Sequence, residues 1–222
     1  MNKFLRVIAI AICISLVLVC LSSCTTNANY FTFEPNVDET GYIITGTAKI
    51  LPDKVVLPNK YQGKPVVKAT IESQSVKELT ISSNIKELSL NCVNLKEVET
   101  KSDFFVVQNN VVYNSKITHI VAILPSTSAN YVMPRTIVSA EKTAFEYALI
   151  ENLFIPKEYY QVALDNISYN GGIPENRIGF TPLFLCDKTM NVFIEVEQDS
   201  NINNILYESA NITIQWNATI PS

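Results

Sequence analysis

The chain has 222 residues with 21 acidic and 17 basic side chains, a net charge of −4 and a single histidine. Hydrophobic residues make up 47% of it, enough to bury the core of one domain or of two small ones. An acidic chain has no broad electrostatic attraction to phosphate groups, which argues against nucleic acid as a partner and against purely electrostatic binding to an anionic bilayer.

The first 24 residues have the pattern of a bacterial export signal. Lys3 and Arg6 give a positive start, residues 7–18 are apolar except for Ser15, and residues 21–24 read Leu-Ser-Ser-Cys. This segment resembles the signal of bacterial lipoproteins. The resemblance implies removal of residues 1–23 and a diacylglyceryl group on the thiol of Cys24, which anchors the mature chain to a membrane. Two or more acyl chains anchor stably, because each buried methylene contributes about 0.8 kcal/mol.

Two other interpretations of this segment are weaker. The apolar run is shorter than the ~20 residues that a membrane-spanning helix needs. An ordinary secretory signal has small residues at both key positions before its cleavage site, and Leu21 is too large there. Cleavage would remove Lys3 and Arg6, which leaves 15 basic and 21 acidic residues and a net charge of −6. The lipid is therefore the expected membrane anchor.

Short β-rich runs follow the signal. Residues 24–29 predict a polar, lipidated tether. Residues 30–33 (YFTF), 41–46 (GYIITG) and 55–57 (VVL) are dominated by β-branched and aromatic side chains, which favours strands. We therefore expect an N-terminal β cap over residues 30–53 and little helix in the chain.

Short patterns then recur at spacings of 19 to 22 residues. The three pairs are VKEL at 76–79 with LKEV at 95–98, YVMP at 131–134 with LFIP at 153–156, and NVFI at 191–194 with NITI at 211–214. These spacings fit the short end of the leucine-rich-repeat range and are too short for a strand–helix–strand crossover. They predict a solenoid whose coils stack their strands into a parallel sheet over a shared core.

The alternation within one coil predicts which side chains are buried. We expect the aliphatic side chains to point inward, namely Leu79, Ile81, Ile85, Leu88 and Leu90. The charged side chains fall at the complementary positions, namely Lys77, Glu78, Lys86 and Glu87. A β-sandwich with chance similarity between its strands would explain the same runs, and periodicity alone leaves that alternative open.

Longer motifs resemble a known family. Residues 55–67 (VVLPNKYQGKPVV) resemble the entry segment of BspA-type leucine-rich-repeat proteins, in which a strand ending in Leu-Pro leads through a Tyr-x-Gly-x-Pro-Val turn into the first coil. Residues 102–113 are similar to the inserted hairpin of that family, and Ala144-Phe145 matches the pair that plugs each coil. The resemblance implies a mainly β, short leucine-rich-repeat solenoid over residues 30–222, with recognition rather than catalysis as its activity.

The chain departs from the family pattern in its last third. Residues 165–182, which include Gly171 and Gly172, interrupt the repeat spacing. We expect a loop insertion there, followed by the last coils and a C-terminal cap over residues 183–222 that contains Trp216. Cys92 and Cys186 invite a disulfide in an exported protein, but both lie in apolar stretches, so two separate buried thiols are favoured.

No motif in the chain points to an enzyme, a cofactor or a metal site. His119 has no histidine or cysteine partner at zinc-binding spacing and predicts a packed or surface side chain. The nucleophile motif Gly-x-Ser-x-Gly is absent. Gly171, Gly172 and Gly179 fit neither a phosphate loop nor a dinucleotide fingerprint.

The family resemblance implies a lipid-anchored protein of the bacterial cell envelope, at the cell surface, that recognises a protein or host-surface ligand. Side chains from successive coils would stand in rows at the ~4.8 Å strand spacing, and Lys77 and Lys96 are candidate contacts. Two alternatives are a structural or assembly protein of the envelope, and a solute-binding or enzymatic lipoprotein with a deep pocket.

Overall fold

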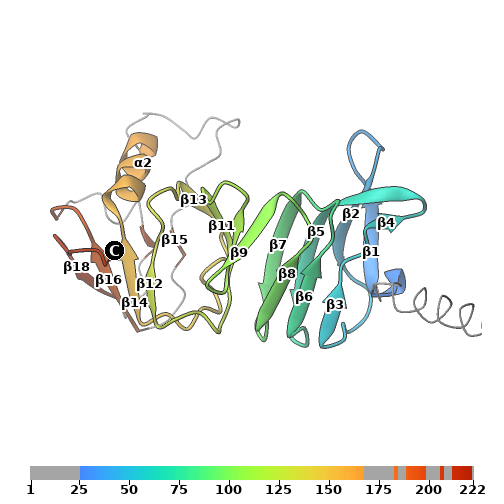
Figure 1. Ribbon diagram of the computed structural model, residues 1–222, viewed down its shortest axis with the longest axis horizontal. Helices are drawn as coiled ribbons and strands as arrows, with labels where there is room; N and C mark the ends of the chain where they lie inside the picture. Colours follow the sequence, from blue (N-terminus) through green and yellow to red (C-terminus); the bar gives the residue numbers. More distant parts are fainter. Residues whose placement is uncertain (1–25, 168–182, 185–188, 199–205, 208–211, 222) are drawn as a thin grey trace, which may run out of the picture.

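The computed structural model describes residues 26–167, 183–184, 189–198, 206–207 and 212–221, which form an elongated β-solenoid (Figure 1). Most strands pair in parallel with the equivalent strand of the next coil. The predicted mainly β solenoid with stacked parallel strands and little helix is therefore confirmed. Residues 1–23, Cys24, Cys186 and most of the expected insertion at 165–182 lie outside the described residues.

The N-terminal end begins with a short 3₁₀ helix, η1 (Ala28–Tyr30). It leads into β1 (Phe31–Pro35), which pairs antiparallel with β2 (Tyr42–Thr47). β4 (Lys60–Tyr61) and the start of β5 (Lys64–Ser73) form a tight antiparallel turn, in which Gly63 has a φ of +80°. Glycine adopts this conformation without steric cost, which explains the Tyr-x-Gly-x-Pro pattern.

Two parallel sheets form the first part of the solenoid. One contains β2, β5 and β7 (Glu87–Cys92), and the other contains β3 (Lys54–Val56), β6 (Glu78–Ile81) and β8 (Glu97–Thr100). In the second sheet Glu78 lies opposite Glu97 and Leu79 lies opposite Val98, so the predicted 19-residue repeat is confirmed. The five aliphatic side chains expected to point inward are all buried.

An antiparallel sheet then crosses the solenoid. It contains β9 (Phe105–Gln108), β10 (Val111–Asn114) and β11 (His119–Ile123). The turn between β9 and β10 is formed by Asn109 and Asn110, with φ values of +52° and +61°, as a two-residue hairpin of this type requires. A hairpin was expected within residues 102–113, and the structure confirms it.

This crossing sheet is buried on both faces. Val112, Val121 and Ala122 pack into one hydrophobic core with the preceding coils. Val111, Tyr113, Ile120 and Ile123 pack into a second core with the coils that follow. A strand covered on both sides reads as a continuous apolar run, as β11 does. We call residues 26–101 the first segment, β9–β11 the dividing sheet, and residues 124–221 the second segment.

The second segment has its own parallel sheet of β12 (Asn130–Val132), β14 (Asn152–Ile155), β16 (Met190–Ile194) and β18 (Ile212–Gln215). Tyr131 lies opposite Leu153, which confirms the predicted 22-residue repeat. The predicted 20-residue repeat between β16 and β18 is wrong, because Asn191 lies opposite Thr213. A shift of two residues leaves every side chain on the same face of a strand, so alternation could not detect the error.

The other elements of this segment complete its far side. β13 (Ser139–Ala140) pairs in parallel with β11, and β15 (Leu183–Phe184) pairs in parallel with β17 (Leu206–Tyr207). Ala144 and Phe145, the expected plug, are both buried in the second core. Helix α2 (Lys157–Ile167) follows β14 and buries Tyr159 and Tyr160 in the same core.

The structure also shows the positions of Trp216 and Cys92, two further described side chains for which the sequence made a prediction. Trp216 is partly buried on the second core, where its ring meets the ring of Tyr160 edge-on, with centroids 6.1 Å apart. Cys92 has a buried free thiol, as expected, and burial raises its pKa to about 11. A thiol with so high a pKa is a packing group rather than a nucleophile.

Candidate binding surfaces

The sheet β3–β6–β8 presents charged rows to solvent. Lys54, Glu78 and Glu97 lie opposite one another in successive coils. Lys54 Nζ lies 2.7 Å from Glu78 Oε2. In the next outward row, Thr80 Oγ1 donates a hydrogen bond to Glu99 Oε2 at 3.4 Å. We call this surface of the first segment the charged face.

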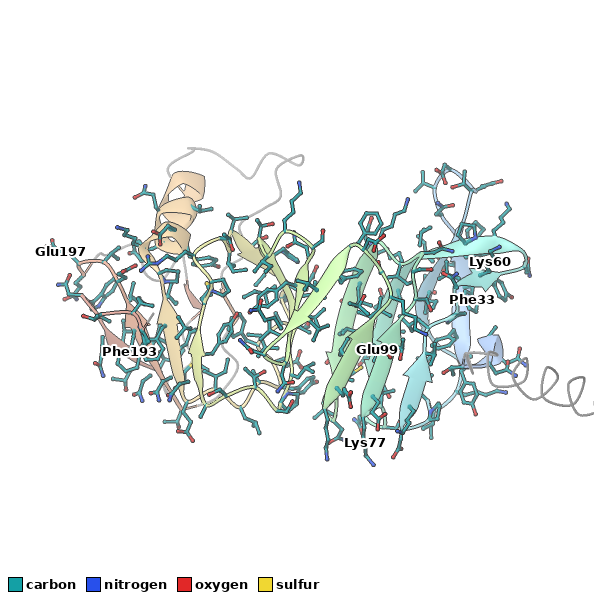
Figure 2. The ribbon with its side chains drawn as sticks, in the orientation of Figure 1. Phe33, Lys60, Lys77, Glu99, Phe193 and Glu197 are labelled. Carbon is teal, nitrogen blue, oxygen red and sulfur yellow. The ribbon has the colours of Figure 1, made fainter. Side chains whose placement is uncertain are left out.

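The candidate residues Lys77 and Lys96 lie at one end of the charged face. Each residue directly precedes a strand, and the backbone N–H of Lys96 donates to the carbonyl of Lys77 at 2.8 Å. Lys77 Nζ also forms an ion pair with Asp53 Oδ2 at 2.7 Å, with both side chains about half exposed. The two lysines therefore occupy equivalent positions in adjacent coils, at the edge of the charged rows rather than within them. Figure 2 labels Lys77 at this edge.

The sheet of the second segment presents neutral rows instead. Asn130, Asn152, Asn191 and Thr213 lie opposite one another. The side-chain amide of Asn152 donates to Asn130 Oδ1 at 2.6 Å, and that of Asn191 donates to Asn152 Oδ1 at 2.8 Å. We call this row the amide row, and this outward surface the neutral face.

Beside the amide row runs a second row that contains two aromatic rings. Val132, Phe154, Phe193 and Gln215 lie opposite one another in successive coils. The rings of Phe154 and Phe193 stack with centroids 4.6 Å apart and an interplanar angle of 13°. Figure 2 labels Phe193 on this sheet and Glu99 on the charged face. Sequence reasoning missed both rows, although an asparagine at or near the start of β12, β14 and β16 was a usable signal.

An arginine with two glutamates joins three coils at the end of the neutral face. Arg135 Nη1 and Nη2 donate to the two carboxylate oxygens of Glu195 at 2.7 and 2.8 Å, and Nη1 also donates to Glu158 at 2.7 Å. The backbone N–H of Lys157 donates to Glu195 at 3.1 Å. The hydrogen bonds from Arg135, with that from Lys157, lower the pKa of Glu195 to about 2. We call this group the carboxylate clamp.

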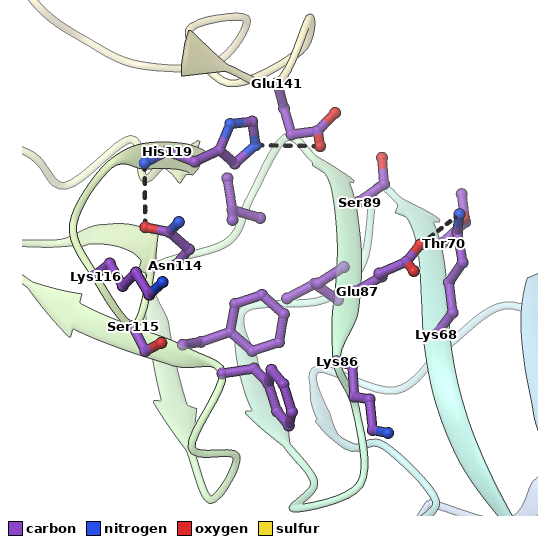
Figure 3. A pocket seen from close by; sticks show the side chains of 14 residues that line it. Lys68, Thr70, Lys86, Glu87, Ser89, Asn114, Ser115, Lys116, His119 and Glu141 are labelled. Carbon is purple, nitrogen blue, oxygen red and sulfur yellow. Dashed lines mark hydrogen bonds and ion pairs between the residues drawn. The ribbon is translucent and has the colours of Figure 1, made fainter. Parts of the chain in front are cut away.

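Two open grooves lie at opposite ends of the dividing sheet's hairpin. The first, of about 580 Å³, is lined by His119 and by charged side chains (Figure 3), namely Lys68, Lys86, Glu87, Lys116 and Glu141. The second, of about 600 Å³, lies between the hairpin turn and β12, and its lining includes Gln108, Asn109, Asn110, Ser126, Ser128 and Asn130. We call the second one the amide groove, because asparagine and glutamine side chains are prominent in its lining. All of its lining side chains are uncharged.

His119 lines the charged groove but is held by its neighbours. Its Nδ1 lies 2.7 Å from Ser139 Oγ, and its Nε2 lies 3.3 Å from Glu141 Oε1. Ser139 is buried and is not among the residues that line the groove, so this serine–histidine–glutamate chain presents no hydroxyl to a substrate there. His119 is a half-buried residue of the parallel pair β11–β13, within the packed or surface placement that the sequence predicted.

Within the part of the chain that the structure describes, no group of three or more histidine, cysteine, aspartate or glutamate side chains is arranged to hold a metal ion. None of the helices described is both long and apolar enough to cross a membrane.

Comparison with known proteins returned two structural similarities. No protein-family model and no curated protein matches the chain. The leucine-rich-repeat protein TpLRR of T. pallidum is 18% identical over 59% of this chain and 71% of its own, with a TM-score of 0.39. A leucine-rich-repeat protein from Eubacterium ventriosum is 14% identical over 48% of each chain, with a TM-score of 0.35.

Proposed function

We propose that the protein is a lipid-anchored, non-catalytic recognition protein of the bacterial cell envelope, with a BspA-type leucine-rich-repeat domain that binds a protein or host-surface ligand. The observation that supports this proposal is the set of in-register rows on the outward surface of the stacked strands. Such rows offer an extended, open surface, which suits a macromolecular ligand better than a small one.

The charged face is the part of this surface that suits a protein ligand. The row of Lys54, Glu78 and Glu97 carries charges of both signs, and Lys77 and Asp53 form a second exposed pair beside it. Exposed pairs of this kind contribute little to stability. Charges of both signs at fixed positions instead favour a partner with the complementary pattern, because complementarity speeds association and excludes wrong partners. Lys77 and Lys96 remain the contacts that we expect to matter most.

The N-terminal end of the domain supports attachment close to the membrane. Thr26, two residues after Cys24, is already tied to the first coil. Its backbone N–H donates to the carbonyl of Val56 at 3.1 Å, and its hydroxyl accepts from the N–H of Val56 at 2.9 Å. A chain extends by at most ~3.6 Å per residue. A lipid on Cys24 would therefore hold the first coil near the bilayer, with the second segment further along the solenoid.

Protease treatment of intact cells tests this proposal. Loss of the mature domain from intact cells, detected with an antibody, is the expected result. Protection until the cells are lysed, with the protein still in the membrane fraction, would contradict surface exposure and favour an assembly role inside the envelope. The control replaces residues 1–24 with an ordinary cleavable secretory signal, which should move the protein out of the membrane fraction while leaving its folding unchanged.

A second experiment separates the candidate face from the rest of the domain. Once a protein ligand is captured, Lys77→Ala combined with Lys96→Ala should weaken its binding. Lys101→Ala, which removes an exposed lysine outside this pair, is the matched control. Unchanged binding in the double variant would remove Lys77 and Lys96 from the site.

A further inference from the structure

We propose that the second segment binds an uncharged polysaccharide, which lies across the strands of the neutral face and extends into the amide groove. This ligand differs in chemistry from the protein ligand proposed for the charged face, and the two sites do not share side chains. The inference therefore stands or fails independently of the proposed function.

The amide row has hydrogen-bonding capacity left for a ligand. A side-chain amide has two N–H donors and an oxygen with two lone pairs. Asn152 uses one N–H toward Asn130 and one lone pair toward Asn191, so each side chain keeps a donor and an acceptor beyond the row. Asn130 and Asn191 are exposed. The row can therefore both donate hydrogen bonds to hydroxyl groups and accept them, and a hydroxyl group is itself both a donor and an acceptor.

The spacing of the rows favours a sugar chain over a peptide. Equivalent side chains in successive coils are separated by the strand spacing, about 4.8 Å, whereas an extended peptide advances about 3.3 Å per residue. A peptide laid across the strands would fall out of step with the rows after one coil. The rings of an extended pyranose chain repeat at close to the strand spacing, so one sugar unit can meet one coil.

The aromatic row adds an apolar surface next to the polar one. Phe154 and Phe193 stack on one another and are only partly buried, so part of each ring stays open beside the amides. A sugar ring has the same division, with hydroxyl groups at its rim and C–H groups on its faces. Burial of apolar area contributes about 25 cal/mol per Å² wherever these C–H groups meet a ring.

The amide groove extends this uncharged, hydrogen-bonding surface beyond the sheet. Asn130 belongs both to the amide row and to the groove, so the two are continuous. The hydroxyl groups of Tyr113 and Tyr131, which also line the groove, lie 3.0 Å apart. Burial raises the pKa of both, so they remain protonated at neutral pH. The lining therefore has no formal charge to attract an ionic ligand.

Binding of soluble hexasaccharides to the mature, lipidated protein tests the proposal, in a detergent without a sugar headgroup. The neutral set is cellohexaose, mannohexaose and N-acetylchitohexaose, and hexagalacturonate and a neutral twelve-residue peptide are the comparisons. We expect calorimetry to detect binding of at least one neutral hexasaccharide and of neither comparison. Its affinity should hold between about 0.05 and about 0.5 M NaCl, because no ion pairs are formed.

Two variants locate the site. Asn152→Leu interrupts the middle of the amide row, and Asn130→Asp introduces a charge with almost no change in shape. Each should weaken binding about tenfold or more, the size expected for one lost hydrogen bond. Asn94→Leu is the matched control, because Asn94 is an exposed amide of the first segment that donates to the carbonyl of Gln74 at 2.7 Å. Thermal melts confirm folding, and Asn130→Asp remains informative if Asn152→Leu does not fold.

Four results would overturn the proposal, and the first three concern sugar binding. They are no binding of any neutral hexasaccharide, equal binding of hexagalacturonate, and unchanged binding in folded Asn130→Asp. A fourth is self-association, because in-register amide and aromatic rows can also pack one sheet against another. Sedimentation that shows a dimer in the wild type and a monomer in Asn152→Leu would identify a second copy of the chain as the occupant.

Discussion

The two segments of the solenoid share one architecture and differ in what they present to solvent. The first segment has lysines and glutamates at its outward positions, whereas the second has asparagines and phenylalanines at the equivalent positions. Inward, both are packed with hydrophobic side chains. The repeat therefore determines only the alternation of strand and turn, and the outward positions are free to take different chemistry along one molecule.

The dividing sheet explains how two such segments can coexist. Because β10 and β11 contribute side chains to both cores, they replace one coil of the parallel stack with a layer that is apolar on each face. Both grooves are built against this layer, at opposite ends of its hairpin. Changes in the dividing sheet should therefore affect both segments, whereas changes on either face should stay local.

The largest expected effect comes from shortening a buried side chain in the dividing sheet. Ile120 is fully buried, so Ile120→Ala should lower the free energy of unfolding by about 2–5 kcal/mol. Urea denaturation followed by far-UV circular dichroism and by Trp216 fluorescence measures it. We expect one midpoint for both signals, because the layer supports both cores. A fluorescence transition that moves alone would show that the segments unfold separately. Ile50→Ala, at an exposed position, should change stability by less than about 0.5 kcal/mol.

The turn of the hairpin gives the next effect. Asn109 has a φ of +52°, a conformation that costs most L-residues about 1–2 kcal/mol and glycine almost nothing. We expect Asn109→Ala to be less stable than Asn109→Gly by about 1 kcal/mol in urea denaturation. Equal stability of the two variants would mean that the backbone at this turn adopts another conformation in solution.

The carboxylate clamp predicts a pH dependence that belongs to the second segment. The folded-state pKa of Glu195 is about 2, below its ordinary value of 4.5, so its ionisation stabilises the folded state above about pH 4.5. This stabilisation is lost as the pH falls from about 4.5 toward 2. Glu195→Gln should therefore lower Tm at pH 6 and flatten its fall between pH 5 and about 2. Glu197→Gln, two residues further on, is the control, and an identical profile in both variants would exclude the clamp.

The smallest effect is expected on the charged face. Lys54 and Glu78 form an exposed pair, with 76% and 42% of their side chains accessible. Such pairs are screened by salt. Glu78→Gln should therefore shift Tm slightly at low ionic strength and leave it unchanged at about 1 M NaCl. A shift that persists at high salt would show that Glu78 has a structural role beyond this pair.

Much of the fold could be predicted from the sequence, because a solenoid repeats its inward pattern. The spacing of 19 between Leu79 and Val98, and that of 22 between Tyr131 and Leu153, are the registers of paired strands. The register of β18 was not predictable, since a two-residue shift keeps the same side chains inward. The burial of Tyr159 and Tyr160 depends on where helix α2 packs, and the repeat spacing of the sequence holds no information on that position.

The candidate surfaces were less predictable than the fold. Lys77 and Lys96 were identified because their repeat is close in sequence and has no insertion. The amide row joins Asn152 to Asn191, 39 positions apart, because helix α2 and the segment after it come between two adjacent strands. An asparagine at a strand boundary also indicates a turn. The pairing of strands, rather than residue type, turns these asparagines into one surface.

Side-chain amide NMR tests the difference between the two faces most directly. A titration with the neutral hexasaccharide that binds most tightly would follow the amide signals of the asparagine and glutamine side chains. We expect shifts at Asn130, Asn152, Asn191 and Gln108, with no change at Asn84 or Asn94 in the first segment. Shifts confined to the first segment, or spread equally over both, would contradict it.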